Sequence, residues 1–159
     1  MAEQVYGQIE IPVKYIDDEV KRVVEEEIFR ADKIDWNNYT CRECDLEVHE
    51  KEGIVYIANS MADNGRMEEI EGVLVNKKIP FDAYSSSDFE FPATRIYYRP
   101  GSDNEKPIHH EEELSQGAEE EFVTKHDLKQ LFSLDPKRAM EELKELLGPK
   151  ISSLKDWAT

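Results

Sequence analysis

The chain opens with a segment in which apolar or small residues alternate with mostly polar ones. The residues of one parity are Val5, Gly7, Ile9, Ile11, Val13 and Tyr15. A period of two is typical of a strand with one buried face, so the pattern predicts a half-buried strand over residues 5–15. Pro12 cannot donate a backbone hydrogen bond, and we therefore expect an edge position or a late bulge at this residue.

Helical spacing follows the first strand. Apolar residues recur at intervals of three and four at Ile16, Val20, Val23, Val24 and Ile28. Asp17 and Asp18 suit the cap and the first turn of this helix. Short apolar runs between turn residues predict the remaining elements. These are strands over 39–49, 54–60, 79–84 and 94–99, and a helix over 65–77.

The order of these elements is β-α-β-β-α-β-β, which predicts an α+β fold. The first six elements match a ferredoxin-like, split βαβ arrangement, and the last strand would extend its sheet. One face of such a sheet is left open by the two helices. We expect this face to be covered either by helices of the C-terminal extension or by a second copy of the chain.

The composition changes after Gly101, which predicts three segments. Residues 1–101 form the α+β core domain. Residues 102–121 contain eight acids and one Lys without apolar periodicity, and we interpret them, including His109 to Glu113, as an exposed acidic linker. Residues 122–159 regain helical spacing and form a C-terminal helical segment.

The chain has a large excess of negative charge. It carries 36 Asp and Glu against 20 Lys and Arg, a formal net charge of −16 over 159 residues. The excess is spread along the chain, with 19 acids against 10 bases in residues 1–80 alone. Such a field repels nucleic acids and anionic membranes. It favours a basic partner, and above all a protein that binds nucleic acid.

The location of the protein is predicted from what the chain lacks. It has no apolar stretch long enough to cross a membrane, and Met1 to Gln4 do not begin a signal peptide. With two cysteines, a reducing cytoplasm is the expected compartment. We expect no cofactor.

Cys41 and Cys44 form a CxxC pair, which supplies half of a tetrahedral zinc site. His49, His109 and His110 are the candidates that would complete it. If this segment is a strand, however, Cys41 and Cys44 point to opposite faces. A redox role is disfavoured because Glu43 and its acidic neighbours oppose a lowered thiol pKa. Structural cysteines are the preferred interpretation, and zinc binding is the alternative.

Arg95, Tyr97 and Arg99 share one face of the last predicted strand. Three interpretations are open: an anion-binding face, a protein interface rich in residue types that dominate binding energy, or pairing with the surplus carboxylates. Pairing within the chain is favoured in so acidic a protein, and an interface comes second.

Carboxylates gather in clusters on the predicted helices. The clusters chosen as the binding surface are Glu25, Glu26 and Glu27; Glu68, Glu69 and Glu71; and Glu141, Glu142 and Glu145. The simplest interpretation is a solvated helix face. The alternative is mimicry, because carboxylates fixed in rows can imitate the phosphates of a duplex, which carry one charge per roughly 1.7 Å of axis.

Residues 53–101 resemble small uncharacterised proteins carried by plasmids and phages. The shared features are a strand, an acidic helix, "IPFD", a serine-rich turn and "YRPG". The resemblance brings no catalytic residues. In charge and size the chain is similar to DNA-mimic inhibitors of restriction or CRISPR defence.

The sequence therefore predicts a non-enzymatic acidic binding protein, with mimicry of DNA as the sharpest form of this hypothesis. No glycine-rich phosphate loop, nucleophile elbow or catalytic triad context is present. Two alternatives are an immunity- or adaptor-type interaction module whose acidity is incidental, and a small zinc-binding protein.

Overall fold

A computed structural model gives the fold of residues 4–27, 34–41, 46–87, 92–102, 105–114, 133, 135–147 and 151–159. The protein is an α+β structure built on one antiparallel sheet of six strands. The strands of this sheet are β1 (Gln4–Pro12), β4 (Leu46–Lys51), β5 (Ile54–Asp63), β6 (Phe81–Ser85), β7 (Ala93–Arg99) and β8 (Ile108–Leu114). Their spatial order is β4-β5-β1-β6-β7-β8.

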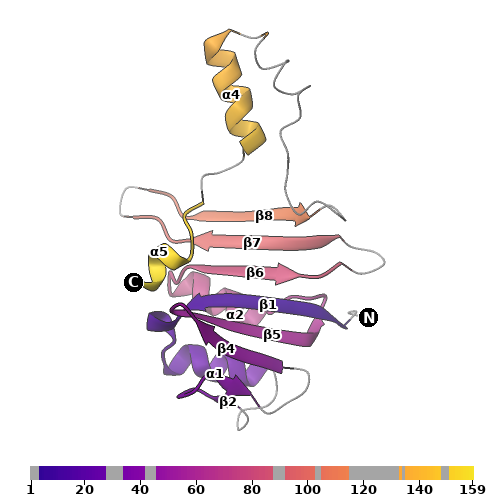
Figure 1. Cartoon of the computed structure of the whole chain (residues 1–159), viewed down its shortest axis with the longest axis vertical. Helices are drawn as coiled ribbons and strands as arrows, with labels where there is room; N and C mark the ends of the chain where they lie inside the picture. Colours follow the sequence, from indigo (N-terminus) through magenta and orange to yellow (C-terminus); the bar gives the residue numbers. More distant parts are fainter. Residues whose placement is uncertain are drawn as a thin grey trace.

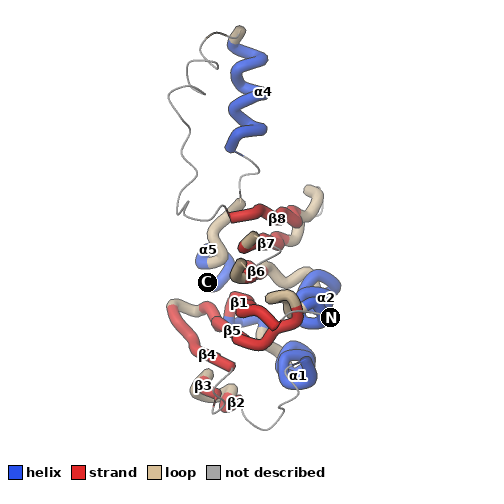
Figure 2. Tube along the Cα trace, turned by 90° about the vertical axis from the view of Figure 1, so that its right-hand side faces the viewer, coloured by secondary structure: helices blue, strands red, loops and turns tan. Residues whose placement is uncertain are grey.

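Helices and a small hairpin complete the described elements. The helices are the 3₁₀ turn η1 (Val13–Tyr15), α1 (Asp18–Glu27), α2 (Glu68–Asn76), α4 (Pro136–Leu147) and α5 (Lys155–Ala158). The hairpin consists of β2 (Ile34–Asp35) and β3 (Thr40–Cys41). Helices α1 and α2 lie side by side against one face of the sheet, and α5 lies on the other face (Figures 1 and 2).

The main core fills the space between the sheet and helices α1 and α2. Every second residue of β1 is buried from Val5 to Ile11, and Ile9 and Ile11 are fully enclosed, which confirms a half-buried strand there. The strand ends at Pro12, however, and residues 13–15, which were expected to continue it, form the 3₁₀ turn η1. Phe81 of β6 and Leu74 of α2 are also fully enclosed. At the start of α1, Asp17 Oδ1 accepts a hydrogen bond of 3.0 Å from the Val20 N–H, as its predicted cap role requires.

The expectation for Pro12 is wrong. It does not lie in an edge strand, because β1 runs between β5 and β6, and the irregularity of β1 falls between Val5 and Gly7. The pairing of β1 with β6 ends at Glu10, so Pro12 faces a ladder partner only on the β5 side. The strand tolerates this proline because the backbone N–H that proline lacks would point to the β6 side, where the pairing has already ended.

Two other predicted elements differ in extent. The strand expected over 39–49 consists of two strands, β3 and β4, with residues 42–45 between them outside the described residues. The helix expected from residue 65 begins at Glu68. Asn64 and Gly65 precede it with positive φ values of 52° and 69°, so the chain must leave the turn before the helix can begin.

The segment Ile108–Leu114 differs most from expectation. It lies within the predicted linker, yet it forms β8 and pairs with β7 along its whole length, from Ile108 opposite Arg99 to Leu114 opposite Ala93. Exposure alternates along it even though the sequence is mostly polar. The pattern of apolar residues does not indicate this strand, because an edge strand needs little apolar surface and is commonly protected by charged residues.

The C-terminal residues pack on the sheet face opposite α1 and α2. Pro12 and Ile54 point to this face and are buried. Leu154, just before α5, is only 3% exposed, and the Arg99 guanidinium donates a hydrogen bond of 2.9 Å to the Ser152 carbonyl. The end of the chain therefore covers one end of this face. The rest of the face is called the open sheet face below.

Candidate functional site

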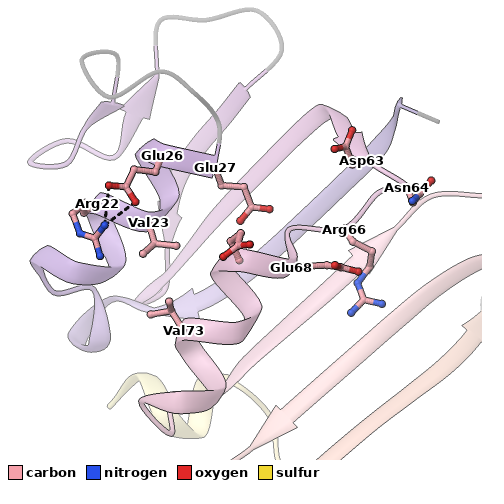
Figure 3. Close-up of a pocket in the computed structure, with 10 residues that line it drawn as sticks. Arg22, Val23, Glu26, Glu27, Asp63, Asn64, Arg66, Glu68 and Val73 are labelled. Atoms are coloured by element: carbon pink, nitrogen blue, oxygen red, sulfur yellow. Dashed lines mark hydrogen bonds and ion pairs between the residues drawn. The ribbon is translucent and has the colours of Figure 1, made fainter. Parts of the chain in front are cut away.

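The main candidate site is a cleft between α1 and α2. Its lining encloses a cavity of about 780 Å³. The lining residues are Arg22, Val23, Glu26, Glu27, Asp63, Asn64, Arg66, Glu68, Glu69 and Val73. Figure 3 shows Glu27 of α1 reaching towards the start of α2. Two of the three predicted carboxylate clusters therefore meet here, although they are more than forty residues apart in the sequence. We call this the acidic cleft.

The acidic cleft has a surplus of negative charge. Five of its lining residues are carboxylates and two are arginines. Both arginines have acidic partners, since Arg22 lies 2.7 Å from Glu26 and Arg66 lies 2.6 Å from Glu71. Glu68 and Glu69 are exposed and have no ion-pair partner within the described residues. The field in the cleft therefore favours a cation.

Glu27 joins the two walls of the acidic cleft. Its Oε2 atom accepts a hydrogen bond of 2.9 Å from the Ile70 backbone N–H, 43 positions away. Met67 precedes α2 and its side chain makes no capping bond, so the cap comes from α1 instead. Burial, and then the charges of Glu71, Glu69 and Glu68, raise the pKa of Glu27 to about 7, while the bond from Ile70 opposes the rise. No local pattern in the sequence predicts this long-range cap.

We expect Glu27→Gln to stabilise the fold at alkaline pH. The folded pKa of about 7 lies above the ordinary value of 4.5, so between these values the folded state binds more protons than the unfolded state. The free energy of unfolding of the wild type therefore falls as pH rises through this range. Glutamine keeps an acceptor for Ile70 without the charge.

At about pH 8 the Glu27→Gln variant should exceed the wild type by about 1 kcal/mol, once solvent screening is allowed for. At about pH 4 the two should be similar, because the carboxyl is then largely protonated in both states. Urea unfolding at both pH values measures the difference. A variant that is less stable than the wild type at the higher pH would contradict this account.

The remaining predicted carboxylates have separate roles. Glu25 is half-buried and accepts a hydrogen bond of 2.7 Å from the Trp36 ring N–H, so it links α1 to the β2–β3 hairpin. Glu71 is only 7% exposed. Glu141 is exposed on α4, which lies away from α1 and α2 (Figure 1). Glu142 and Glu145 also belong to α4, but their side chains lie outside the described residues.

Arg95, Tyr97 and Arg99 share one face of β7, as predicted. Arg95 and Tyr97 lie on the open sheet face, whereas Arg99 lies at the end of this face that the C-terminal residues cover. Arg95 is exposed and Tyr97 is half-buried. Arg99 is only 4% exposed, and its Nη1 atom lies 2.7 Å from Asp82 Oδ1. Arg99 is thus a buried structural residue, which agrees with the favoured expectation of pairing within the chain.

The predicted zinc ligands do not converge in the part of the chain that the structure describes. Cys41 is a half-buried free thiol beside the main core. His49 is exposed and stacks on Tyr56 at 4.8 Å on the open sheet face. Cys44 lies outside the described residues. Among those residues, no group of three or more His, Cys, Asp or Glu is arranged to hold a metal ion.

The lining of the acidic cleft is mainly polar and charged. It offers carboxylates, two paired arginines, an asparagine and two valines.

Comparisons of the chain with protein-family models, with curated proteins and with solved structures found no match. In the described chain, no helix has the length and apolar character needed to cross a membrane.

Proposed function

We propose that the protein is a non-enzymatic binding protein that receives a basic segment of a nucleic-acid-binding protein in its acidic cleft. One observation carries the proposal. The clusters that contain Glu27 and Glu68 lie on opposite walls of one cavity, and the arginines of that cavity are already paired with carboxylates. A lysine- or arginine-bearing segment would supply the missing positive charge.

Mimicry of DNA is the form of this function that the arrangement supports best. Carboxylates on two helices with a groove between them resemble two phosphate rows across a groove of a duplex. The net charge of −16 extends the same field over the rest of the surface. The expected partners are restriction or CRISPR complexes, whose DNA-binding clefts are basic.

We also propose that β1, α1, β4, β5, α2 and β6 form a ferredoxin-like core. The strand order supports this assignment. β5 lies between the two strands that α1 connects, and β1 lies between the two strands that α2 connects, as two interleaved βαβ units require. β7 and β8 then extend the sheet beyond β6.

A second candidate function is an interaction module that uses the open sheet face. The observation that favours it is the presence of several half-buried tyrosines on that face: Tyr6, Tyr56, Tyr84 and Tyr97. Tyrosine and arginine are frequent among the residues that dominate interface energy. If the open sheet face is the interface, the double variant Arg95→Ala, Tyr97→Ala would weaken partner binding more than charge reversal in the acidic cleft would.

The proposed function is tested by binding to purified restriction and CRISPR complexes. The protein is immobilised and each complex is passed over it at low and at high salt. We expect at least one complex to bind at low salt and to be released as the salt concentration rises, because screening weakens contacts between exposed charges. Binding that survives high salt would favour the open sheet face, and no binding to any complex would contradict mimicry.

A further inference from the structure

We propose that two copies of this chain pair edge to edge through β8, with the strands antiparallel and Glu111 at the twofold axis. The inference goes beyond the proposed function and does not depend on the acidic cleft. It rests on the open position of β8 in the sheet, on the contacts that hold it there, and on the self-complementary order of its side chains.

β8 is the last strand of the described sheet and has β7 as its one neighbour. A strand in this position presents a row of backbone N–H and C=O groups to whatever lies beside it. Helix α4 lies beyond β8 in Figure 1, and its residues 135–138 and 140–141 are exposed. His109, Glu111 and Glu113 of β8 are exposed as well.

Side-chain contacts fix β8 in the sheet. The Tyr97 hydroxyl donates a hydrogen bond of 2.7 Å to Glu112, and the Tyr97 ring lies 6.3 Å from that of His110. The rings of His109 and Tyr98 are nearly perpendicular, and their centroids lie 5.9 Å apart. These contacts use atoms that face β7. The contacts hold the backbone of β8 in place, and no strand among the described residues pairs with its outer edge.

The sequence of β8 is complementary to itself when it is read in the opposite direction. Antiparallel pairing about Glu111 sets Ile108 opposite Leu114, His109 opposite Glu113, and His110 opposite Glu112. Apart from the central pair, every pair is therefore apolar with apolar, or imidazole with carboxylate. Residues directly opposite across an antiparallel pair interact most strongly, and a twofold interface repeats each such pair.

The central pair sets Glu111 of one copy against Glu111 of the other. Arg66 lies 3.9 Å from Glu111 within each chain, so a guanidinium stands beside each of the two carboxylates. This reduces the repulsion that like charges in opposite positions would otherwise cause.

Neighbouring registers are poorer. A shift of two residues in one direction sets Glu111 against Glu113, which is repulsive. A shift of two residues in the other direction sets Ile108 against Glu112 and shortens the paired segment. Of these registers, only the one centred on Glu111 pairs all seven residues of β8. It also keeps the helices of both copies on the same face of the joined sheet.

The first test combines two substitutions at exposed residues that the register places opposite each other. His109→Glu sets glutamate against Glu113, and Glu113→Lys sets lysine against His109. Each change is repeated twice by the symmetry, so each variant alone should raise the dimer dissociation constant about tenfold. Mixed together, the two variants should form a heterodimer, because the introduced glutamate and the introduced lysine then face each other.

Sedimentation velocity over a concentration series measures these equilibria, and circular dichroism checks that each variant is folded. Glu105→Lys is the matched control, since Glu105 is exposed, lies outside β8 and undergoes the same charge change as Glu113. A wild-type chain that stays monomeric throughout the series would overturn the proposal. A dimer that neither variant weakens would do the same, because it would use another surface.

A second test locates the axis. In a background with Cys41→Ser and Cys44→Ser, Glu111→Cys should give a disulfide-linked dimer under mild oxidation, because directly opposite Cα atoms lie about 4.5–5.5 Å apart, within disulfide reach. Glu105→Cys in the same background should stay monomeric. Equal cross-linking of the two variants would overturn the register, and so would no cross-link at position 111.

Discussion

Replacing both Glu68 and Glu69 by lysine should weaken binding of the basic partner about 100-fold. Both side chains are exposed on the α2 wall of the acidic cleft and have no ion-pair partner in the described structure. Each reversal replaces an attraction by a repulsion of the partner's cation, and about 1.4 kcal/mol for each would multiply to this factor. Titration of a labelled partner complex at low salt measures the loss.

The matched control for this variant is Glu47→Lys with Glu105→Lys. Both residues are exposed, both lie outside the acidic cleft, and the double change alters the net charge by the same amount. The control should lose only a few-fold in affinity, through the weaker overall field. Equal losses in the two variants would mean that total charge, and not the acidic cleft, governs binding.

Arg99→Met should lower the free energy of unfolding by about 3–5 kcal/mol, the usual effect of removing one partner of a buried ion pair. Asp82 Oδ1 is buried and receives no well-directed hydrogen bond, so the charge of Asp82 is balanced by Arg99 at 2.7 Å. Arg99 also donates to the carbonyls of Phe81, Tyr98 and Ser152 at 2.9 Å each. The substitution would leave these acceptors without their donor.

For a chain of this length, a loss of that size lowers the melting temperature by roughly 10 °C, which calorimetry can measure. Arg95→Met is the matched control, because Arg95 lies on the same face of β7 but is exposed. It should cost less than about 1 kcal/mol. Similar melting temperatures for the two variants would show that Arg99 contributes little to the stability of the fold.

The parts of the fold that follow from local patterns could be predicted from the sequence. Alternation identified the buried face of β1 because Ile9 and Ile11 must both point to the core. Helical spacing identified α1, whose Val20, Val23 and Val24 are buried. Strand β8 could not be recognised in this way, since the partners of Glu112 and His110 are on β7. Its position at the edge of the sheet also removes the need for apolar residues.

The candidate site was predictable in its chemistry but not in its assembly. The clusters at residues 25–27 and 68–71 were recognisable as carboxylate groups. Only the packing of α1 against α2 brings Glu27 to the Ile70 N–H. Arg99 is similar, because nothing in its local sequence separates it from Arg95, and its burial depends on Asp82 and on the C-terminal residues around Ser152.

Competition with duplex DNA is the most direct test of mimicry. A labelled duplex is bound to a restriction or CRISPR complex that the protein retains, and the release of the duplex is followed by fluorescence anisotropy as the protein is added. Mimicry predicts mutual exclusion, with more protein needed as the DNA concentration rises, and a loss of effect in the Glu68→Lys, Glu69→Lys variant. A ternary complex in which the protein and DNA are bound together would contradict it.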